Sequence, residues 1–126
     1  MLRFEKARTQ FGGAVERLRE VLALEKTDVV RDSAIQRFEF TVDLSWKALK
    51  AFLEEKKGLV CRSPKDCFRE AFRQGIIDYD ERWLKWIELR NQTSHTYNEA
   101  LAESVYAQLS DAAEDFGLLF EKLSRN

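Results

Sequence analysis

Apolar residues recur at intervals of three and four positions along nearly the whole chain, and only one proline and five glycines interrupt the pattern. This spacing gathers apolar side chains on one face of a helix, whereas a half-buried strand would need strict alternation. The length of 126 residues suits one domain with a substantial core. The sequence therefore predicts an all-α protein with five helices and no strands, in a single domain over residues 1–126.

The first helix is expected over about residues 4–24. Gly12 and Gly13 interrupt it, each at a cost near ~1 kcal/mol relative to alanine. Close approach of a neighbouring helix would explain this pair, and so would a kink. The apolar seam of the helix consists of Phe4, Ala7, Phe11, Ala14, Leu18 and Val21.

A second, long helix is expected over about residues 29–57, with Asp28 or Asp32 as its N-cap and Gly58 as a left-handed stop. Its apolar residues form one seam and a second group outside it: Ile35, Phe38, Val42, Leu49 and Phe52 in the seam, and Phe40, Leu44, Trp46 and Leu53 outside. Apolar residues around so much of the helix circumference predict two buried faces. One would meet the core of its own chain, and the other a second copy through a two-fold interface.

The third helix has the clearest beginning: Ser63 caps it, Pro64 takes the first position, Asp66 completes the capping box, and Gly75 ends the helix. A basic stripe lies on and just before it, formed by Arg62, Lys65, Arg69 and Arg73. Two interpretations of the stripe remain open. It is either a solvated helix face, which is common, or a binding track for RNA phosphates or an acidic partner.

A fourth helix begins near Asp78 or Asp80, and a fifth follows Asn98 as its cap. The apolar residues of the fourth are Trp83, Leu84, Trp86, Ile87 and Leu89. Those of the fifth are Ala102, Val105, Leu109, Ala112, Phe116, Leu119 and Leu123. The two tryptophans could stack nucleobases, but their spacing favours burial in the core.

The charges nearly cancel, with 21 Lys and Arg against 22 Asp and Glu. No global field would therefore draw the protein onto nucleic acid or an anionic membrane, and any phosphate binding must come from a local patch. The charged N-terminus is unlike a signal peptide, and no apolar stretch approaches the length of a membrane span. We expect a cytoplasmic protein that has no contact with a membrane.

Cys61 and Cys67 are the only cysteines, and His95 is the only histidine. These residues are too few to complete a zinc site, so two reduced structural thiols are expected. The chain also lacks a glycine-rich phosphate loop and a nucleophile elbow. We therefore expect neither a metal nor a cofactor.

The run Arg90-Asn91-Gln92-Thr93-Ser94-His95-Thr96-Tyr97 places a permanent cation, the single imidazole and a phenol at the end of the fourth helix. With an advance of about 100° per residue, Arg90, Asn91, Ser94 and His95 continue the apolar sector of that helix. Polar residues where packing would favour leucine are expected at functional sites.

Two interpretations of this run follow from the residues. In the structural one, Arg90 forms an interhelical ion pair, Asn91 and His95 satisfy backbone groups, and Tyr97 packs. In the functional one, Arg90 binds a phosphate bidentately, His95 moves a proton, and Tyr97 offers a hydroxyl group. Glu39 and Asp43, four residues apart on the second helix, are expected to be counter-charges for arginine and not a catalytic pair.

The chain resembles, over nearly its full length, the nucleotidyltransferase substrate-binding proteins, a branch of the HEPN superfamily that includes HepT-type toxins. The resemblance is carried by the segment over residues 35–47, by Ser63-Pro64, and above all by Arg90 to Tyr97, which fits the family pattern of Arg, four residues, His, one residue, Tyr. It implies an up-and-down helical bundle with a four-helix core, dimerising through helices and encoded beside a minimal nucleotidyltransferase.

The resemblance also implies roles for individual residues. Arg90 and His95 would be catalytic in a metal-independent endoribonuclease, with Asn91 supporting the site. Tyr97 would accept AMP from the partner transferase, which would silence the activity. The alternative is a non-catalytic subunit that docks on the nucleotidyltransferase and holds its substrate through the basic stripe and Arg90.

Overall fold

A computed structural model describes residues 3–78 and 80–125 and shows six α-helices, one short 3-10 helix and no strand within them. The elements are α1 (Arg3–Leu22), α2 (Asp28–Lys57), α3 (Pro64–Arg73), α4 (Asp80–Gln92), the 3-10 helix η1 (Thr93–His95), α5 (Glu99–Tyr106) and α6 (Leu109–Arg125). The predicted all-α class is confirmed. None of these helices is both long and apolar enough to cross a membrane, as far as the described residues show.

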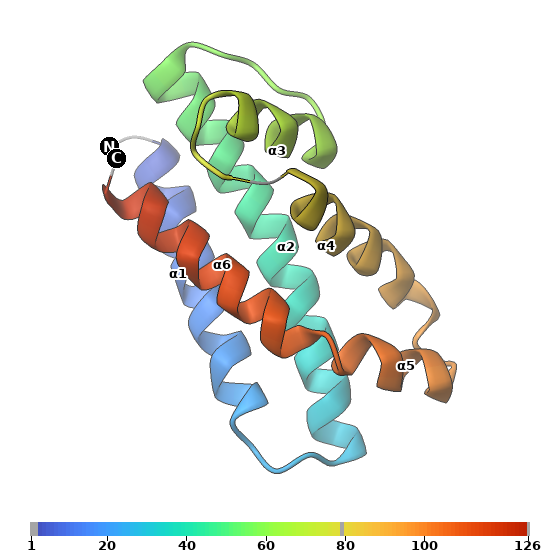
Figure 1. Cartoon of the computed structure of the whole chain (residues 1–126). Coiled ribbons are helices and arrows are strands. Elements are labelled where there is room, and N and C mark those ends of the chain that lie inside the picture. The colour runs from blue at the N-terminus through green and yellow to red at the C-terminus, as the bar shows by residue number, and fades with distance from the viewer. Residues whose placement is uncertain (1–2, 79, 126) are drawn as a thin grey trace.

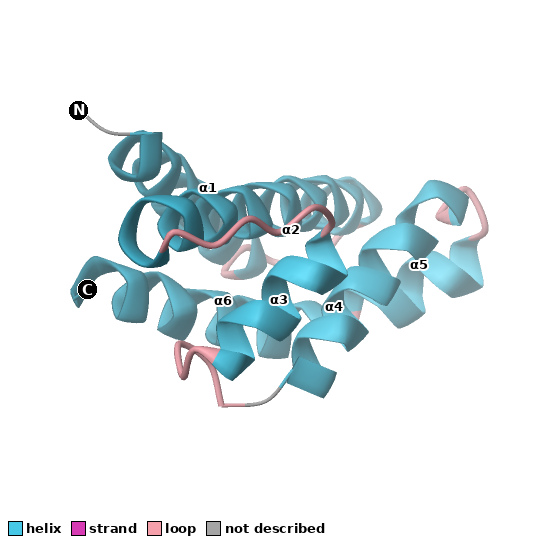
Figure 2. Ribbon diagram, turned by 90° about the horizontal axis from the view of Figure 1, so that it is seen from above, coloured by secondary structure: helices cyan, strands magenta, loops and turns pink. Residues whose placement is uncertain are grey.

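The long helix α2 runs through the middle of the molecule and contacts α1, α3, α4, α5 and α6 (Figure 1). Figure 2 shows α1 and α2 as one layer, with α6, α3 and α4 forming a second layer against it. The two described ends of the chain lie at the same end of the molecule, at the start of α1 and the end of α6 (Figure 1).

Aromatic rings from five helices join the two layers in the core. Phe116 of α6 is the hub, because it makes edge contacts with Phe11 of α1, Phe38 of α2 and Trp83 of α4. Trp83 in turn stacks on Phe68 of α3, with ring centroids 5.1 Å apart. Such pairs add to the burial of apolar area, so these contacts fix how the helices pack as well as stabilise them.

The predicted seams are buried with small exceptions. Every seam residue expected in α2 and in the C-terminal helical region is buried, as are both tryptophans of α4. In α1, however, Val15 is buried while Ala7 and Ala14 are only partly covered. The second apolar face of α2 is less buried than the number of its apolar residues suggested. Leu53 is in the core, but Phe40 is 52% exposed.

Three of the predicted helix boundaries are confirmed by hydrogen bonds. Gly58 has a φ of 66° and ends α2 in the left-handed conformation, which disfavours residues with a Cβ. Ser63 caps α3 by accepting from the Asp66 amide, and Asn98 caps α5 by accepting from the Leu101 amide. The N-cap of α2 was predicted wrongly: Thr27 takes this position and accepts from the Val30 amide.

The expected single C-terminal helix is in fact two helices, α5 and α6, and the chain changes direction between them (Figure 1). Ala107 keeps helical dihedrals, with φ −60° and ψ −19°. The apolar register therefore continues across the junction, and neither Ala107 nor Gln108 is a helix breaker that would mark it.

Gly12 and Gly13 lie within α1, which is helical from Arg3 to Leu22 without interruption. A Cβ built on Gly12 would come within 2.6 Å of the Phe120 ring on α6, whereas a Cβ on Gly13 would meet open space. The prediction of a close helix approach is confirmed for Gly12. For Gly13 the structure offers no packing reason.

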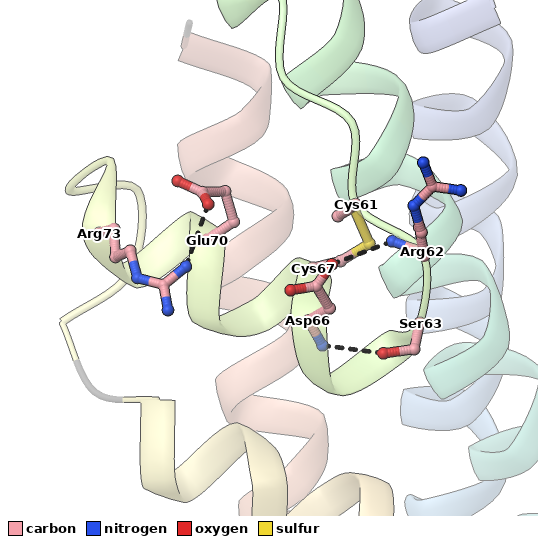
Figure 3. The surroundings of a disulfide bond; sticks show 7 residues. All are labelled: Cys61, Arg62, Ser63, Asp66, Cys67, Glu70 and Arg73. Atoms are coloured by element: carbon pink, nitrogen blue, oxygen red, sulfur yellow. Dashed lines mark hydrogen bonds and ion pairs between the residues drawn. A yellow bond between two sulfur atoms is a disulfide. The ribbon is translucent and has the colours of Figure 1, made fainter.

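The prediction of two reduced thiols is wrong, because Cys61 and Cys67 form a disulfide (Figure 3). The extended segment after Gly58 turns back along α2 and brings Cys61 onto the first turn of α3. The two Cα atoms lie 5.1 Å apart, within the range that a disulfide spans. The spacing of six residues had carried no sign of this approach.

Candidate functional site

Arg90, near the end of α4, reaches across to α2 and forms an interhelical ion pair with two carboxylates. Its Nε and Nη2 donate to the two oxygens of Asp43 at 3.2 and 3.1 Å, and Nη1 donates to Glu39 Oε2 at 3.1 Å. The bidentate fork holds the guanidinium in one orientation. Glu39 and Asp43 are therefore counter-charges for an arginine, as the sequence predicted.

Electrostatics keep Arg90 charged and leave its surroundings acidic. The hydrogen bonds that Arg90 donates to Asp43, with smaller contributions from the charges of Asp43 and Glu39, raise the pKa of Arg90 above its ordinary value, while partial burial opposes them. One cation thus faces two anions, which leaves a net charge of −1 for the triad. The Arg90 side chain is 31% exposed, so solvent and solutes can still reach it.

Thr93 is a member of this cluster that the sequence analysis missed. Its hydroxyl oxygen lies 2.6 Å from both Glu39 Oε2 and the Arg90 carbonyl oxygen, and it accepts from Arg90 Nη1 at 3.3 Å. Thr93 is buried, at 6% exposure. Its position three residues after Arg90, one helical turn on, is the signal that could have identified it.

The helical-wheel prediction fails at Asn91, Ser94 and His95. Asn91, Ser94 and His95 are exposed, and Thr93 turns inward in their place. At about 100° per residue, Thr93 falls between the buried Trp86 and Leu89, whereas Asn91 and His95 fall outside that sector. Ser94 departs from the wheel where α4 gives way to the 3-10 helix η1, in which each residue advances by about 120°. Asn91, Ser94 and His95 therefore lie at the surface, whereas Thr93 continues the buried sector of α4.

His95 and Tyr97 lie together on that surface. Their rings meet edge to face with centroids 6.0 Å apart, and Tyr97 is 87% exposed. Tyr97 does not pack against the core, contrary to the structural interpretation. An imidazole and a phenol are thus both open to a substrate or to a second protein.

A second arginine, Arg31, binds carboxylates across the helices and was not singled out in the sequence. Its Nη1 donates to Glu99 and Glu103 on α5 at 3.0 and 2.9 Å, and its Nε donates to Asp32 at 3.0 Å. These bonds, that of Glu103 first, raise the pKa of Arg31 above its ordinary value, while burial opposes them. Glu103 also pairs with Lys26, and the two cations lower the pKa of Glu103.

The Arg31 cluster anchors α5 to the start of α2. Because α5 follows directly after Tyr97 and Asn98, the cluster holds one end of the segment that carries the motif. The spacing of Glu99 and Glu103, four residues apart and both facing one side of a helix, is the signal that could have revealed it.

The basic stripe of Arg62, Lys65, Arg69 and Arg73 is exposed along α3. Arg73 pairs with Glu70 at 3.1 Å, and the Arg62 amide donates to Asp66 within the cap (Figure 3). The stripe and the motif lie at opposite ends of α4 (Figure 1). The structure therefore does not bring these two sets of candidate residues into one site.

The outer face of α2 borders a groove shared with α1. Its volume is about 500 Å³, and its lining includes Gly13, Ala14, Gln36, Phe40 and Leu44. The exposed ring of Phe40 is its main apolar feature. This is the face on which the sequence predicted a second copy of the chain.

Comparison with known proteins places these features in a family. The model described as nucleotidyltransferase substrate binding protein like matches residues 2–125. A relative from Haemophilus influenzae named a probable ribonuclease HepT is 37% identical over 100 residues, which cover 76% of this chain and 68% of that protein.

Solved structures agree with this match. A Thermus thermophilus protein is 40% identical with a TM-score of 0.80, covering 90% of this chain and 94% of that one. A Haemophilus influenzae structure, described as revealing the fold of a substrate-binding domain of a nucleotidyltransferase, is 31% identical with a TM-score of 0.71 over 96% of each chain. A toxin–antitoxin structure with AMP-PNP is 15% identical with a TM-score of 0.76 and shares the fold. The match along nearly the whole length shows that this chain belongs to the nucleotidyltransferase substrate-binding protein family, with HepT among its relatives.

Proposed function

We propose that this chain is a HepT-like, metal-independent endoribonuclease whose activity is silenced by AMP transfer to Tyr97 from a partner nucleotidyltransferase. The observation that carries the proposal is the motif itself: the only imidazole of the chain lies beside an exposed phenol, five residues after an arginine held by a bidentate bond. The relative named a probable ribonuclease HepT supports the same activity.

His95 acts as the general base in this proposal. It takes the proton from a ribose 2′-hydroxyl, whose oxygen attacks the adjacent phosphorus while the bond to the 5′-oxygen breaks. The leaving 5′-oxygen needs a proton in turn. Because the chain has one histidine, the second proton donor would be His95 of a partner copy, so activity depends on a dimer.

Arg90 has a constrained role, because Asp43 and Glu39 already occupy its fork. To stabilise charge on the phosphate, it exchanges one carboxylate for a phosphate oxygen, which its partial exposure permits. Otherwise it acts as a positioning residue that holds η1, and with it His95. Asn91, exposed at the start of this segment, supports the same site.

The dimer would form on the outer face of α2, around the exposed Phe40. AMP on Tyr97 would add a phosphate and a bulky base beside His95, which repels the RNA backbone and blocks access. Tyr97 has the exposure that such an acceptor requires.

The test is His95→Ala, measured as cleavage of RNA by the purified dimer and as growth inhibition on expression. We expect a loss of about 100-fold or more, the usual contribution of a general base. Ser94→Ala is the matched control, because Ser94 is an exposed neighbour on η1. Unchanged cleavage in His95→Ala, or full activity in a strict monomer, would overturn the proposal.

A second candidate function is favoured by the net negative charge around Arg90, which opposes phosphate binding. In it, the chain is a non-catalytic subunit that docks on the nucleotidyltransferase through the basic stripe and holds its substrate. This reading predicts a stable complex, no cleavage of RNA, and loss of the complex on Lys65→Glu with Arg69→Glu. It fails if the transferase alone binds its substrate equally well.

A further inference from the structure

A groove of about 470 Å³ runs beside Tyr97 and shares Ser33 and Gln36 with the groove around Phe40. Its walls come from α2 and from the motif segment, and they are Asp32, Ser33, Gln36, Glu39, Thr96 and Tyr97. The buried Ile35 also lines it. Residues four and seven positions apart share one face of a helix, which is why α2 presents a continuous wall.

Tyr97 gives this groove a flat aromatic edge. With 87% of the residue exposed, its ring is not covered by the chain. An exposed aromatic ring beside a groove is suited to stacking on a planar ligand, and every nucleobase offers a π-face.

Two carboxylates give the groove a definite hydrogen-bonding character. Asp32 accepts from Arg31 through Oδ1 only, and Glu39 accepts from Arg90 and Thr93 through Oε2 only. Across the described residues, Asp32 Oδ2 and Glu39 Oε1 therefore receive no hydrogen bond from the protein. The groove offers acceptor oxygens and negative charge, so it disfavours a phosphate and favours an N–H donor.

We infer that this groove binds the base of a nucleotide and selects a purine that carries an exocyclic amino group. The amino group donates to the acceptor oxygens of Asp32 or Glu39, and the ring stacks on Tyr97. The inference deepens the proposed function and rests on it for the source of the nucleotide. That source is either a residue of the RNA strand or the AMP attached to Tyr97, because both present the same base chemistry.

The experiment uses the full chain and two pairs of nucleotides that differ by one amino group. AMP is compared with purine riboside 5′-monophosphate, and GMP with IMP, by calorimetry and by amide shifts in NMR. We expect the amino-bearing member of each pair to bind about tenfold more tightly, as for one hydrogen bond to a charged acceptor. The shifts should fall on Ser33, Gln36 and Thr96. Equal affinities within both pairs, or shifts confined to α3, would overturn the inference.

A matched pair of variants separates the groove from the Arg31 cluster. Asp32→Asn removes a groove carboxylate, whereas Asp28→Asn removes a carboxylate that also pairs with Arg31, at 3.7 Å, but does not line the groove. The preference for the amino-bearing purines should weaken in Asp32→Asn and persist in Asp28→Asn. Equal loss in both variants would assign the effect to the ion pairs of Arg31 and refute the groove.

Two further measurements identify the source. Displacement of AMP from the groove by a short RNA that contains one adenosine would support a strand nucleotide. Loss of free AMP binding after the partner transferase has adenylylated Tyr97 would support the attached nucleotide, and neither result would overturn the inference. Failure of the proposed function is seen separately, as unchanged RNA cleavage in His95→Ala, and does not alter the binding comparison.

Discussion

Two arginines form ion pairs between α2 and a later helix, Arg31 with α5 and Arg90 from α4, and they differ in their exposure to solvent. Arg31 is 5% exposed and lies among Asp28, Asp32, Glu99 and Glu103. The Arg90 side chain is 31% exposed and has two carboxylates and the buried Thr93 as partners. Both hold helices together, but only Arg90 keeps a path to solvent.

The difference separates a structural ion pair from one that can also serve a site. An enclosed guanidinium with a full set of acceptors cannot exchange them without local opening, because the charges would be left unpaired. A partly exposed one can exchange a carboxylate for a phosphate more readily, since solutes reach the guanidinium directly from solvent. The comparison can be tested by four measurements, from the largest expected effect on stability to the smallest.

Arg31→Met should cause the largest loss of stability. It removes the donor for Asp32, Glu99 and Glu103 and leaves these carboxylates to repel one another, while methionine keeps the apolar stem. We expect a lower urea midpoint than in any other variant here, and faster amide exchange in α5. Arg31→Lys should restore part of the loss. An unchanged midpoint in Arg31→Met would contradict the role of this cluster as the anchor of α5.

Arg90→Met should cost less, about 2 kcal/mol of unfolding free energy, because it leaves two hydrogen-bonded carboxylates without their cation, whereas Arg31→Met leaves three. Solvent screens part of the remaining repulsion, since Asp43 is 41% exposed. The double variant Arg90→Met with Asp43→Asn should recover part of the loss, as the repulsion with Glu39 is removed. A loss as large as that of Arg31→Met would show that exposure does not distinguish the two clusters.

Acid should weaken the Arg31 cluster through Glu103, whose pKa is lowered by Lys26 and Arg31. A carboxylate with a lowered pKa in the folded state stabilises the protein above its unfolded pKa, and this contribution is lost as the pH falls through the folded pKa. The difference in urea midpoint between wild type and Glu103→Gln should therefore shrink as the pH is lowered from about 6 to about 3. A difference that is independent of pH would show that the charge of Glu103 does not contribute.

His95→Ala and Tyr97→Ala should have the smallest effect on stability, within about 0.5 kcal/mol, because both side chains are exposed. Their effects should appear in RNA cleavage and in nucleotide binding instead. Urea unfolding of each variant beside wild type measures this. A loss of stability comparable to that of Arg90→Met would mean that the two rings support η1, and would weaken the case for a functional surface.

Much of the fold could be predicted from local pattern. The seam of α2, the stop at Gly58 and the caps at Ser63 and Asn98 depend on spacing and on residue types within one or two turns. The division of the C-terminal region at Ala107 could not be predicted, because the chain stays helical in its dihedrals there and the change of direction follows from packing.

The site was predicted less completely. The pairing of Arg90 with a carboxylate was foreseen as an interhelical ion pair, and Glu39 and Asp43 were foreseen as counter-charges. The inward turn of Thr93 and the exposure of His95 were not, because the apolar sector was extended to Asn91, Ser94 and His95, although Thr93 lies between the buried Trp86 and Leu89 on the wheel of α4.

Helical periodicity, the caps and the spacing from Arg90 to Tyr97 are properties of neighbouring residues, so the linear order of the chain was enough to establish the all-α class and the family resemblance. The disulfide between Cys61 and Cys67, the two arginine clusters and the groove beside Tyr97 join residues that are close only after the helices pack. Their geometry depends on the direction in which each helix leaves its turn. No local pattern carries that direction, because it is set by the core around Phe116.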